Sequence, residues 1–379
     1  MTQEKNAFRI PLFKPWLGNE ELEEIKSVFE SGWVGLGPKT TEFENALGQY
    51  LGVKNVVGTN SCTSALHLAL EILNVRGKEV LLPALTFVST AHAVIHAGGK
   101  PVWVDVEEDT LCMDPEDLNE KITKKSACVI PVHYAGHPCE MDTILKIARD
   151  NDLGVVEDAA QAMGAEYRHV KIGALDSDLT CFSFHATKNI TTGEGGAITT
   201  NSETLARRLR KLRFLGADRD TWTRLKEARE RYWHFVCESV GYKYYMNDVT
   251  AAIGIAQLRK IDKILERKRY LFSRYSEMLA KIPDVEIPVV RNGVLPSAYA
   301  YVIKCENRDA LMEYLGACGI TTGVHYMPVH MHPPYRKYRK KLPVTEEIWH
   351  KILTIPLYYE LKDAEQDYIV EKIHEFYKK

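Results

Sequence analysis

The sequence of 379 residues lacks the features of several protein classes. Lys and Arg total 49 against 51 Asp and Glu, so the net charge of −2 provides no positive field for nucleic acid. No segment is long and apolar enough to cross a bilayer, and the first residues, MTQEKNAFRI, contain no apolar stretch of the signal-peptide kind. We therefore expect a cytoplasmic protein that binds neither nucleic acid nor membrane.

Cysteine and histidine spacing argues against structural cross-links and metal sites. The eight cysteines are scattered, and no two of them form a CxxC pair. This distribution is more typical of reduced thiols than of a disulfide framework or a zinc site. His325, His330 and His332 lie close together, but no Cys or acidic residue stands at ligand spacing from them. We therefore expect no metal.

Short apolar segments alternate with helical patterns, as a mostly parallel sheet flanked by helices requires. These segments lie near residues 79–82, 101–105, 127–131, 154–157, 179–184 and 196–200. A chain of this length is too long for one simple core and suits two domains. We predict a large α/β domain over residues 1–255 and a smaller C-terminal α+β domain over residues 256–379.

The predicted link between the two domains is a long helix that starts near residue 248 and runs toward residue 281. In the smaller domain, the pattern predicts a strand over 299–305, a helix over 308–318 and a second strand over 320–326. An α+β arrangement follows.

Lys188 is the most informative single residue. It follows an apolar strand in DLTCFSFHATKN and precedes a loop that contains Gly193, Gly195 and Gly196. A lysine becomes a nucleophile toward carbonyl groups when an apolar setting disfavours its ammonium form, and a rigid strand can aim its amine. A lysine taken at random is a solvated surface residue. The surrounding motifs favour a Schiff-base lysine instead.

Asp158 ends another short buried-strand pattern, GVVEDAAQ. The carboxyl ends of strands are where open α/β sheets present functional groups. A pyridoxal phosphate enzyme needs a carboxylate beside the pyridine nitrogen, because a protonated ring withdraws electrons from the substrate. An N-cap for the following helix is the simpler role for an Asp after a strand. The presence of Lys188 favours the cofactor role.

A strand, a polar turn and a helix follow one another in VVGTNSCTSAL, residues 56–66. The free N–H groups at such a helix start bind phosphate, with help from Ser and Thr hydroxyls. Any capped helix has the same appearance, so this pattern is weak alone. Together with Lys188 and Asp158 it predicts a pyridoxal phosphate site.

These motifs carry a family resemblance. The runs SGWVGLGPKTTEFE, PALTFVSTAHAVIHAGGKPVWVDV, PVHYAGHPCEMD, VVEDAAQAMGAEY, FSFHATKNITTGEGG and GYKYYMNDVTAAIGIAQL resemble successive motifs of the DegT-like sugar aminotransferases. The resemblance runs from about Pro11 to the C-terminus. It implies the aspartate aminotransferase fold (fold type I), whose large domain has a seven-stranded sheet, and pyridoxal 5′-phosphate as the cofactor.

The resemblance also assigns residues to the cofactor. It makes Lys188 the Schiff-base lysine and Asp158 the partner of the pyridine nitrogen. It places Phe87 over the ring face, where an aromatic side chain holds a flat ring without competing for its polar edges. Without the family, ordinary core would be the simpler reading of Phe87. The remaining implied cofactor contacts are Gln161 beside the phenolic oxygen, and Cys62, Thr63, Ser183 and Lys243 at the phosphate.

Lys243 matches a position at which relatives reach the cofactor phosphate of the neighbouring subunit. The resemblance therefore implies a homodimer with shared active sites. It also implies L-glutamate as amino donor and a ketosugar as acceptor, with SFHATKN closest to the branch that acts on nucleotide-linked 4-keto-6-deoxysugars. Such enzymes make amino sugars for cell-surface polysaccharides or natural products.

The substrate pocket is harder to derive. We expect substrate contacts from loops that contain Trp33, His185, Tyr245, His325 and His330. His185 is three residues from Lys188, and a group there either assists proton transfer or packs beside the cofactor. Tyr245 and His137 depart from the common family pattern. Each of them bears either on substrate choice or on the subunit boundary.

Two alternatives remain open. Some relatives of the same fold are sugar dehydratases that have histidine in place of the lysine, and Lys188 argues against that activity. A domain that binds pyridoxal phosphate without catalysis, as a sensor or scaffold, is the other alternative. The sequence shows no attached DNA-binding segment in support of it.

The charged segment from Asp218 to Ser239 is most simply a solvated helix face. Its aromatic residues would instead line a substrate or subunit surface, since exposed aromatics are costly unless used. They are Trp222, Tyr232, Trp233 and Phe235.

Overall fold

The computed structural model describes residues 10–227 and 233–378, and its centre is a seven-stranded sheet. The strand order is β1-β9-β8-β5-β4-β2-β3, and β9 alone runs antiparallel to its neighbours. The mostly parallel sheet is thus confirmed. The strands are β1 (Asn55–Thr59), β2 (Glu79–Pro83), β3 (Lys100–Val104), β4 (Ser126–Val129), β5 (Gly154–Asp158), β8 (Leu179–Ser183) and β9 (Gly196–Thr200).

Both faces of this sheet are covered by helices, and the strands are therefore apolar on both sides. Successive residues alternate between two cores: Leu81 and Val155 belong to one, whereas Leu82 and Val156 belong to the other. The first core is covered by α2 (Pro38–Leu51), α6 (Met141–Asp150) and α9 (Asp248–Leu279). The second is covered by α3 (Cys62–Ile72), α4 (Val88–His96) and α7 (Glu203–Arg213). Continuous apolar runs in the sequence follow from this double burial.

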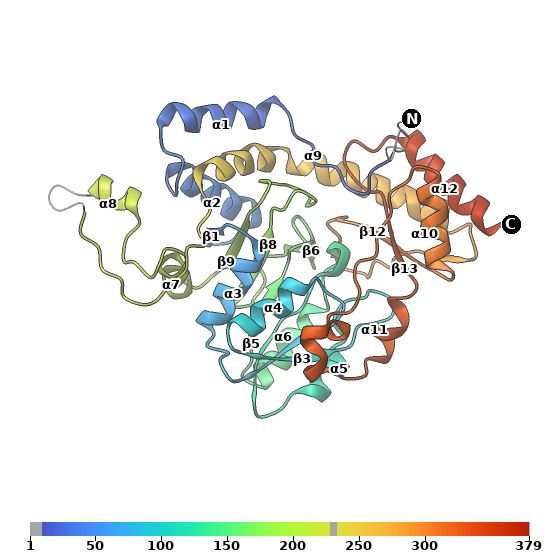
Figure 1. Ribbon diagram of the computed structural model, residues 1–379, viewed down its shortest axis with the longest axis horizontal. Coiled ribbons are helices and arrows are strands. Elements are labelled where there is room, and N and C mark those ends of the chain that lie inside the picture. Colours follow the sequence, from blue (N-terminus) through green and yellow to red (C-terminus); the bar gives the residue numbers. More distant parts are fainter. Residues whose placement is uncertain (1–9, 228–232, 379) are drawn as a thin grey trace, which may run out of the picture.

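The long helix predicted from residue 248 is confirmed as α9, and α1 (Asn19–Ser31) packs along it at the top of Figure 1. Beyond α9, a three-stranded sheet of order β10-β12-β13 packs with α10 (Arg308–Ala317) and α12 (Asp363–Tyr377). Its strands are β10 (Val285–Glu286), β12 (Tyr301–Cys305) and β13 (Ile352–Ile355). The strand predicted over 299–305 and the helix predicted over 308–318 are therefore confirmed.

The strand predicted over 320–326 is wrong. This segment makes only two isolated bridges, from Ile320 to Ile10 and from Gly323 to Thr354. Gly323 exchanges hydrogen bonds with Thr354 of β13, but the chain then leaves this strand, and His325 and Tyr326 line the cavity described below. The third strand of the small sheet comes from residues 352–355 instead.

The domain boundary predicted at residues 255 and 256 stays a prediction. We call the seven-stranded sheet with its covering helices the large unit, and the β10-β12-β13 sheet with α10 and α12 the small unit. The chain passes between these two units more than once. Helix α9 passes through the predicted boundary without a break. Ile10 packs in the core of the small sheet, whereas Val329 and Leu342 pack in a core of the large sheet. The short helix α11 (Pro343–Ile348) is tied back to the large unit because the N–H of Val344 donates to Asp105 at 3.0 Å.

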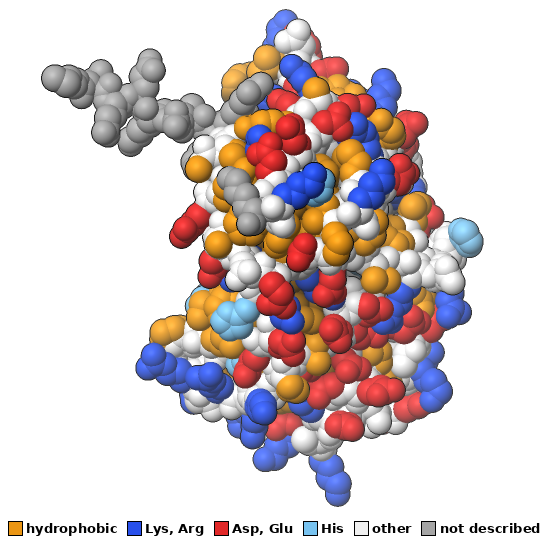
Figure 2. Space-filling view, turned by 90° about the vertical axis from the view of Figure 1, so that its right-hand side faces the viewer, with side chains coloured by type: hydrophobic (Ala, Val, Ile, Leu, Met, Phe, Trp, Pro, Cys, Tyr) orange, Lys and Arg blue, Asp and Glu red, His pale blue; other side chains and the backbone are white. Residues whose placement is uncertain are grey.

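The segment 218–239 is only partly helical, with α8 (Thr221–Glu227) as its one regular element among the described residues. Trp222 meets Trp33 edge to face, with ring centroids 5.1 Å apart, and Tyr232 lies outside the described residues. No helix in the part of the chain that the structure describes is long and apolar enough to span a membrane. On the face shown in Figure 2, acidic and basic side chains are interspersed.

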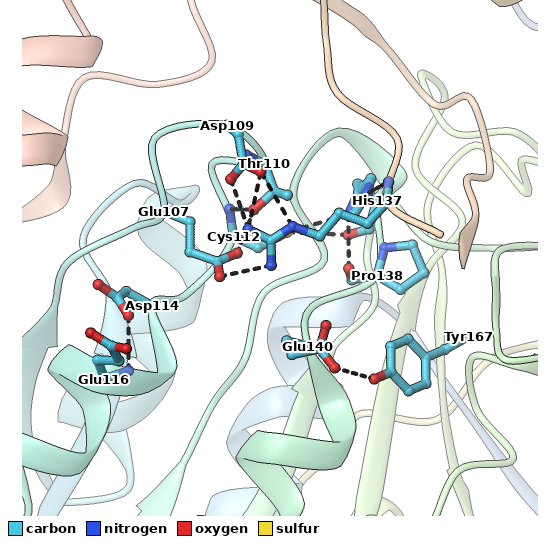
Figure 3. A network of polar contacts seen from close by, with 11 residues as sticks. Glu107, Asp109, Thr110, Cys112, Asp114, Glu116, His137, Pro138, Glu140 and Tyr167 are labelled. Carbon is cyan, nitrogen blue, oxygen red and sulfur yellow. Dashed lines mark hydrogen bonds and ion pairs between the residues drawn. The ribbon is translucent and has the colours of Figure 1, made fainter. Parts of the chain in front are cut away.

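A strap from the small unit crosses to the large one at residues 287–296. Within it, β11 (Val294–Leu295) pairs with β6 (Glu166–Tyr167), which in turn pairs with β7 (Val170–Lys171). The guanidinium of Arg291 donates to Glu107 at 2.8 Å and to Asp109 at 2.9 Å, and its N–H donates to His137 at 3.3 Å. Figure 3 shows Glu107, Asp109 and His137 gathered in this network. His137 thus fastens the strap.

Replacing Arg291 by Ala is expected to lower the free energy of unfolding by about 1–2 kcal/mol, because two partly buried carboxylates lose a shared partner. Chemical denaturation with the cofactor bound measures this loss. Arg149→Ala is the matched control: its ion pair with Asp176 is highly exposed, so its effect should stay below about 0.5 kcal/mol. Equal losses in both variants would contradict the role of the strap.

Candidate functional site

A cavity of about 550 Å³ lies at the carboxyl ends of the central strands. The large unit lines it with residues that follow β1, β2, β5 and β8, and the segments after α9 add Tyr299, His325 and Tyr326. The position agrees with the rule that open α/β sheets bind ligands outside the carboxyl ends of their strands. The predicted residues among the lining are Cys62, Thr63, Phe87, Asp158, Gln161, Ser183, His185, Lys188 and His325.

Asp158 and Lys188 face the same cavity because β5 and β8 are neighbours. The strands pair in parallel, with Asp158 opposite Cys181, so both chains leave the sheet at the same edge. The chain then turns after Phe184, and the N–H of Lys188 donates to the carbonyl of His185 at 2.9 Å. This turn brings the Lys188 side chain back over the end of β5 and into the cavity lining.

Asp158 is a buried carboxylate, 5% exposed. It accepts hydrogen bonds from the Thr90 hydroxyl at 2.7 Å and from the N–H of Ala160 at 3.1 Å. Burial raises the pKa of Asp158, although these hydrogen bonds and the charge of Lys188 oppose the shift. A cation beside this carboxylate would stabilise its ionised form.

Lys188 points its amine at Tyr299. The amine lies 3.4 Å from the Tyr299 hydroxyl and 4.4 Å from the centre of its ring. Phe13 stacks on the same ring, with centroids 5.3 Å apart and an angle of 16° between the planes. Tyr299 is therefore held in place on one side by Phe13 and presents its hydroxyl to Lys188.

The start of α3 forms one end of the cavity. Ser61 caps the helix by accepting from the N–H of Ser64, and the Thr63 hydroxyl donates to Ser89 at 2.9 Å. The first N–H groups of a helix have no partner within the helix and carry partial positive charge. A methyl group added to Gly196 would lie 2.6 Å from the Cys62 nitrogen. Only a glycine at position 196 lets β9 pass this close to the start of α3.

Gln161 and Phe87 lie around another part of the lining. The Gln161 carboxamide accepts from the N–H of Ala135 at 2.6 Å and donates to the Tyr326 hydroxyl at 2.9 Å. The ring of Phe87 lies 5.7 Å from that of Tyr326 and is 54% exposed. An aromatic ring that lines a cavity and stays half exposed is available to a flat ligand.

Two histidines line the cavity in different environments. His185 is exposed, with its Nδ1 3.1 Å from the Thr187 hydroxyl and its Nε2 3.8 Å from Glu194. His325 is more enclosed and its Nδ1 lies 2.7 Å from the Thr354 hydroxyl. Burial, followed by the charge of Lys188, lowers the pKa of His325 to about 4. His325 is therefore a neutral imidazole at neutral pH.

The other predicted site residues lie outside this cavity. Trp33 packs against Trp222, and its indole N–H donates to the carbonyl of Leu36 at 2.9 Å. Lys243 is exposed on the segment beside Phe214, and the ring of Tyr245 packs near the same Phe214 at 5.3 Å. Contacts of these side chains with a ligand stay predictions that involve a second subunit.

His330 is the predicted substrate residue that the geometry supports least. Its side chain is fully buried, its Nε2 lies 3.1 Å from Glu346, and its ring packs 6.4 Å from that of Trp103. Its contact with the substrate stays a prediction. Among the described residues, no group of three or more His, Cys, Asp or Glu side chains is arranged to hold a metal ion.

Sequence reasoning missed three residues of the lining. Thr90 holds the Asp158 carboxylate, Tyr299 meets the Lys188 amine, and Tyr326 meets Gln161. Tyr299 and Tyr326 lie more than a hundred positions from their partners, and aromatic residues beside predicted strands are usually core. Thr90 lies three residues after Phe87 in the run PALTFVST. Its hydroxyl at the start of a helix is the one feature of the sequence that could have indicated its contact with Asp158.

The lining fits pyridoxal 5′-phosphate. No Lys or Arg forms an ion pair with the buried Asp158 among the residues that the structure describes, so the carboxylate suits a protonated ring nitrogen. Lys188 would provide the amine for the aldehyde. The start of α3, with Thr63 and Ser183, would hold the phosphate, and the close approach at Gly196 keeps that end narrow.

Comparison with known proteins agrees with this geometry. The model of the DegT/DnrJ/EryC1/StrS aminotransferase family matches residues 15–374. The uncharacterized protein MJ1066 of Methanocaldococcus jannaschii is 41% identical over 93% of this chain and 94% of its own. The spore coat polysaccharide biosynthesis protein SpsC of Bacillus subtilis is 37% identical over 100% of this chain and 99% of its own.

Solved structures are similar over almost the whole chain. The sugar aminotransferase CalS13 from Micromonospora echinospora superimposes with a TM-score of 0.90 at 31% identity, covering 97% of this chain and 99% of its own. Spr1654 from Streptococcus pneumoniae, in its PMP form, gives a TM-score of 0.91 at 30% identity, covering 97% and 98%. The same protein has also been solved in a PLP form.

Gly196→Ala is expected to weaken pyridoxal phosphate binding by about tenfold or more, because the new methyl group would overpack the start of α3. Equilibrium titration of the apoenzyme with the cofactor, followed by absorbance, measures the change. Gly316→Ala is the control, since a methyl group there meets no atom within 4 Å. Unchanged cofactor affinity in Gly196→Ala would show that this end of the cavity does not hold the phosphate.

Proposed function

Because the chain belongs to the DegT/DnrJ/EryC1/StrS aminotransferase family and is a PLP-dependent sugar aminotransferase, we propose that it transfers the amino group of L-glutamate to a nucleotide-linked 4-keto-6-deoxysugar. The observation that supports this best is the placement of Lys188 and Asp158, which reach one cavity from neighbouring parallel strands. A lysine that binds the aldehyde and an acid that keeps the ring protonated are what transamination requires.

The names of relatives support a sugar product destined for a polysaccharide. SpsC, which matches this chain from end to end, is named for spore coat polysaccharide biosynthesis, and CalS13 is described as a sugar aminotransferase. We extend these descriptions to an amino sugar made for a cell-surface polysaccharide. In a 4-keto-6-deoxysugar, the carbon that receives the amine is C4.

The residues of the chain divide the reaction between them. Pyridoxal phosphate, when bound, supplies an aldehyde that accepts the amino group and a ring that spreads the negative charge left at the reacting carbon. Lys188 would hold the aldehyde, and its amine, when free, would act as the base that takes the proton from the donor's α-carbon. Asp158 would keep a proton on the ring nitrogen. Tyr299 keeps the Lys188 amine aimed into the cavity.

The sugar side of the site is built from neutral and polar groups. His325 is neutral at neutral pH and its ring is fixed by Thr354, so it can exchange hydrogen bonds with a sugar hydroxyl without adding charge. His185 stands at the exposed side of the cavity, within reach of an incoming substrate and close to Lys188. We assign His185 to substrate contact and proton transfer at the mouth of the cavity.

We propose that the active enzyme is a homodimer whose sites are shared. Lys243 is exposed and lies outside the cavity of its own chain, although its assigned partner is a cofactor phosphate. The same segment contains Tyr245, and the neighbouring surface contains Trp33 and Trp222. If a second subunit packed against this surface, Lys243 would reach the phosphate of the cofactor bound by that subunit. The second subunit would also cover the rings of Tyr245, Trp33 and Trp222.

The proposed reaction predicts that nitrogen from ¹⁵N-labelled L-glutamate appears in the sugar when nucleotide-linked ketosugars are supplied. Lys188→Ala should reduce this transfer by a factor on the order of 10³ or more and should abolish the absorbance of the lysine-bound cofactor. Mass spectrometry of the sugar product and a visible spectrum provide the two measurements. Lys146→Ala, which changes an exposed lysine paired with Asp150, is the control.

Several outcomes distinguish this proposal from its rivals. Full transfer by Lys188→Ala would refute the role of the lysine. Loss of water from the sugar without incorporation of ¹⁵N would indicate a dehydratase. Cofactor binding with no turnover of any donor would indicate a sensor or scaffold.

The shared site predicts complementation between two inactive variants. In a heterodimer of Lys188→Ala and Lys243→Met, one site has both changes and the other has neither. A mixture that exchanges subunits should therefore regain about a quarter of the wild-type activity, whereas each variant alone stays low. Activity against mixing time, with subunit exchange followed by mass, measures this. No recovery despite exchange would place Lys243 outside the shared site.

A further inference from the structure

Lys268 is a buried lysine behind the site, on α9. It is 4% exposed, and no carboxylate pairs with it among residues 10–227 and 233–378. Lys260 on the same helix offers a contrast, because it is also buried but pairs with Glu21 at 2.6 Å and lies over the ring of Trp16. An unpaired buried amine is costly and therefore needs an explanation.

The amine of Lys268 holds the two groups that surround Lys188. It donates to the side-chain oxygen of Asn189 at 2.6 Å and to the carbonyl of Tyr299 at 3.1 Å. Asn189 follows Lys188 directly in the chain, and Tyr299 accepts from the Lys188 amine through its hydroxyl. Asn189 is itself fixed, since its side-chain nitrogen donates to Ser297 at 2.8 Å.

The ring of Tyr299 is in contact with both amines. The Lys188 amine lies 4.4 Å from the ring centre and the Lys268 amine lies 5.8 Å from it. Asn189, Lys188 and Lys268 also line one narrow cleft behind the main cavity. Burial, followed by the charge of Lys188, lowers the pKa of Lys268 to about 7. Two amines that face one ring repel each other when both are charged.

We propose that Lys268 is a positioning residue for Lys188, which holds Asn189 and Tyr299 in place and disfavours positive charge at the Lys188 nitrogen. This inference rests on the proposed role of Lys188 as the lysine that binds the cofactor. A neighbouring cation is a known means of keeping a reactive amine in its nucleophilic form. Lys268 itself does not line the main cavity and therefore acts through Lys188.

In the described part of the chain, no other charged or titratable group that faces the two lysines is expected to have the effect of Lys268 on Lys188. Asp158 acts in the opposite direction, and the His325 imidazole is neutral at neutral pH. Lys14, which also lines the narrow cleft, is neutralised by Glu360 at 2.8 Å. The other titratable groups that face the two lysines include those of the narrow cleft, Tyr358 and Tyr359, and those of the main cavity, Cys62, His185, Glu194, Tyr299 and Tyr326.

The test follows the absorbance of the PLP-loaded enzyme against pH without substrates. Lys268→Met removes both the charge and the hydrogen bonds, whereas Lys268→Gln keeps a donor for Asn189 and removes the charge. Both variants should raise the midpoint of the spectral titration by about one pH unit. The reason is that the positive charge of Lys268, which opposes protonation of the nitrogen between Lys188 and the cofactor, is gone. Lys268→Arg keeps the charge and should restore the wild-type midpoint. Lys260→Met is the matched control and should leave the midpoint unchanged.

The outcomes separate this inference from the proposed function. Cofactor content and thermal unfolding establish that each variant is folded and loaded. A wild-type midpoint in loaded Lys268→Met and Lys268→Gln, even with lowered stability, would overturn the positioning role and leave only packing. Persistence of the lysine-dependent absorbance in Lys188→Ala would instead refute the assignment of Lys188. If Lys268→Met does not fold, the smaller change in Lys268→Gln decides the result.

Discussion

Parallel pairing of β5 with β8 is the constraint on which the site depends. The pairing sets Asp158 opposite Cys181, so the acid that would meet the ring nitrogen and the lysine that would meet the aldehyde leave the sheet at one edge. Neither residue is placed by its own local sequence. The distance between them is fixed by hydrogen bonds between strands that are themselves buried on both faces, and such strands move little.

The buried charges of the molecule are stabilised in different ways. In the scaffold, Arg213 meets Glu44 and Lys260 meets Glu21, whereas Asp105 and Asp248 accept hydrogen bonds from the starts of α11 and α2. At the site, Asp158 and Lys268 have hydrogen-bond partners but no ion pair among the described residues. A buried charge without an ion pair lowers stability, so Asp158 and Lys268 beside one cavity mark a place where the fold gives up stability for chemistry.

The sequence predicted most of the large unit because its signals are local. Strands buried on both faces appear as apolar runs, and Lys188, Asp158 and the start of α3 each follow such a run. The failure at residues 320–326 has the opposite cause, since Ile320 and Gly323 find their partners in Ile10 and Thr354 and local pattern contains no information on those contacts. His330 is a related case, because Glu346 and Trp103 enclose it from elsewhere in the chain and the local pattern does not indicate these contacts.

Two of the three residues that sequence reasoning missed share one origin. Tyr299 and Tyr326 come from the segments after α9, and they close the cavity against Lys188 and Gln161 of the large unit. The strap at Arg291 and the amine of Lys268 join the same two units on either side of these tyrosines. The chemistry therefore depends on how the two units are held together as well as on the sheet. A change that loosens the strap would act on the reaction through the position of Tyr299, although Arg291 itself does not line the cavity.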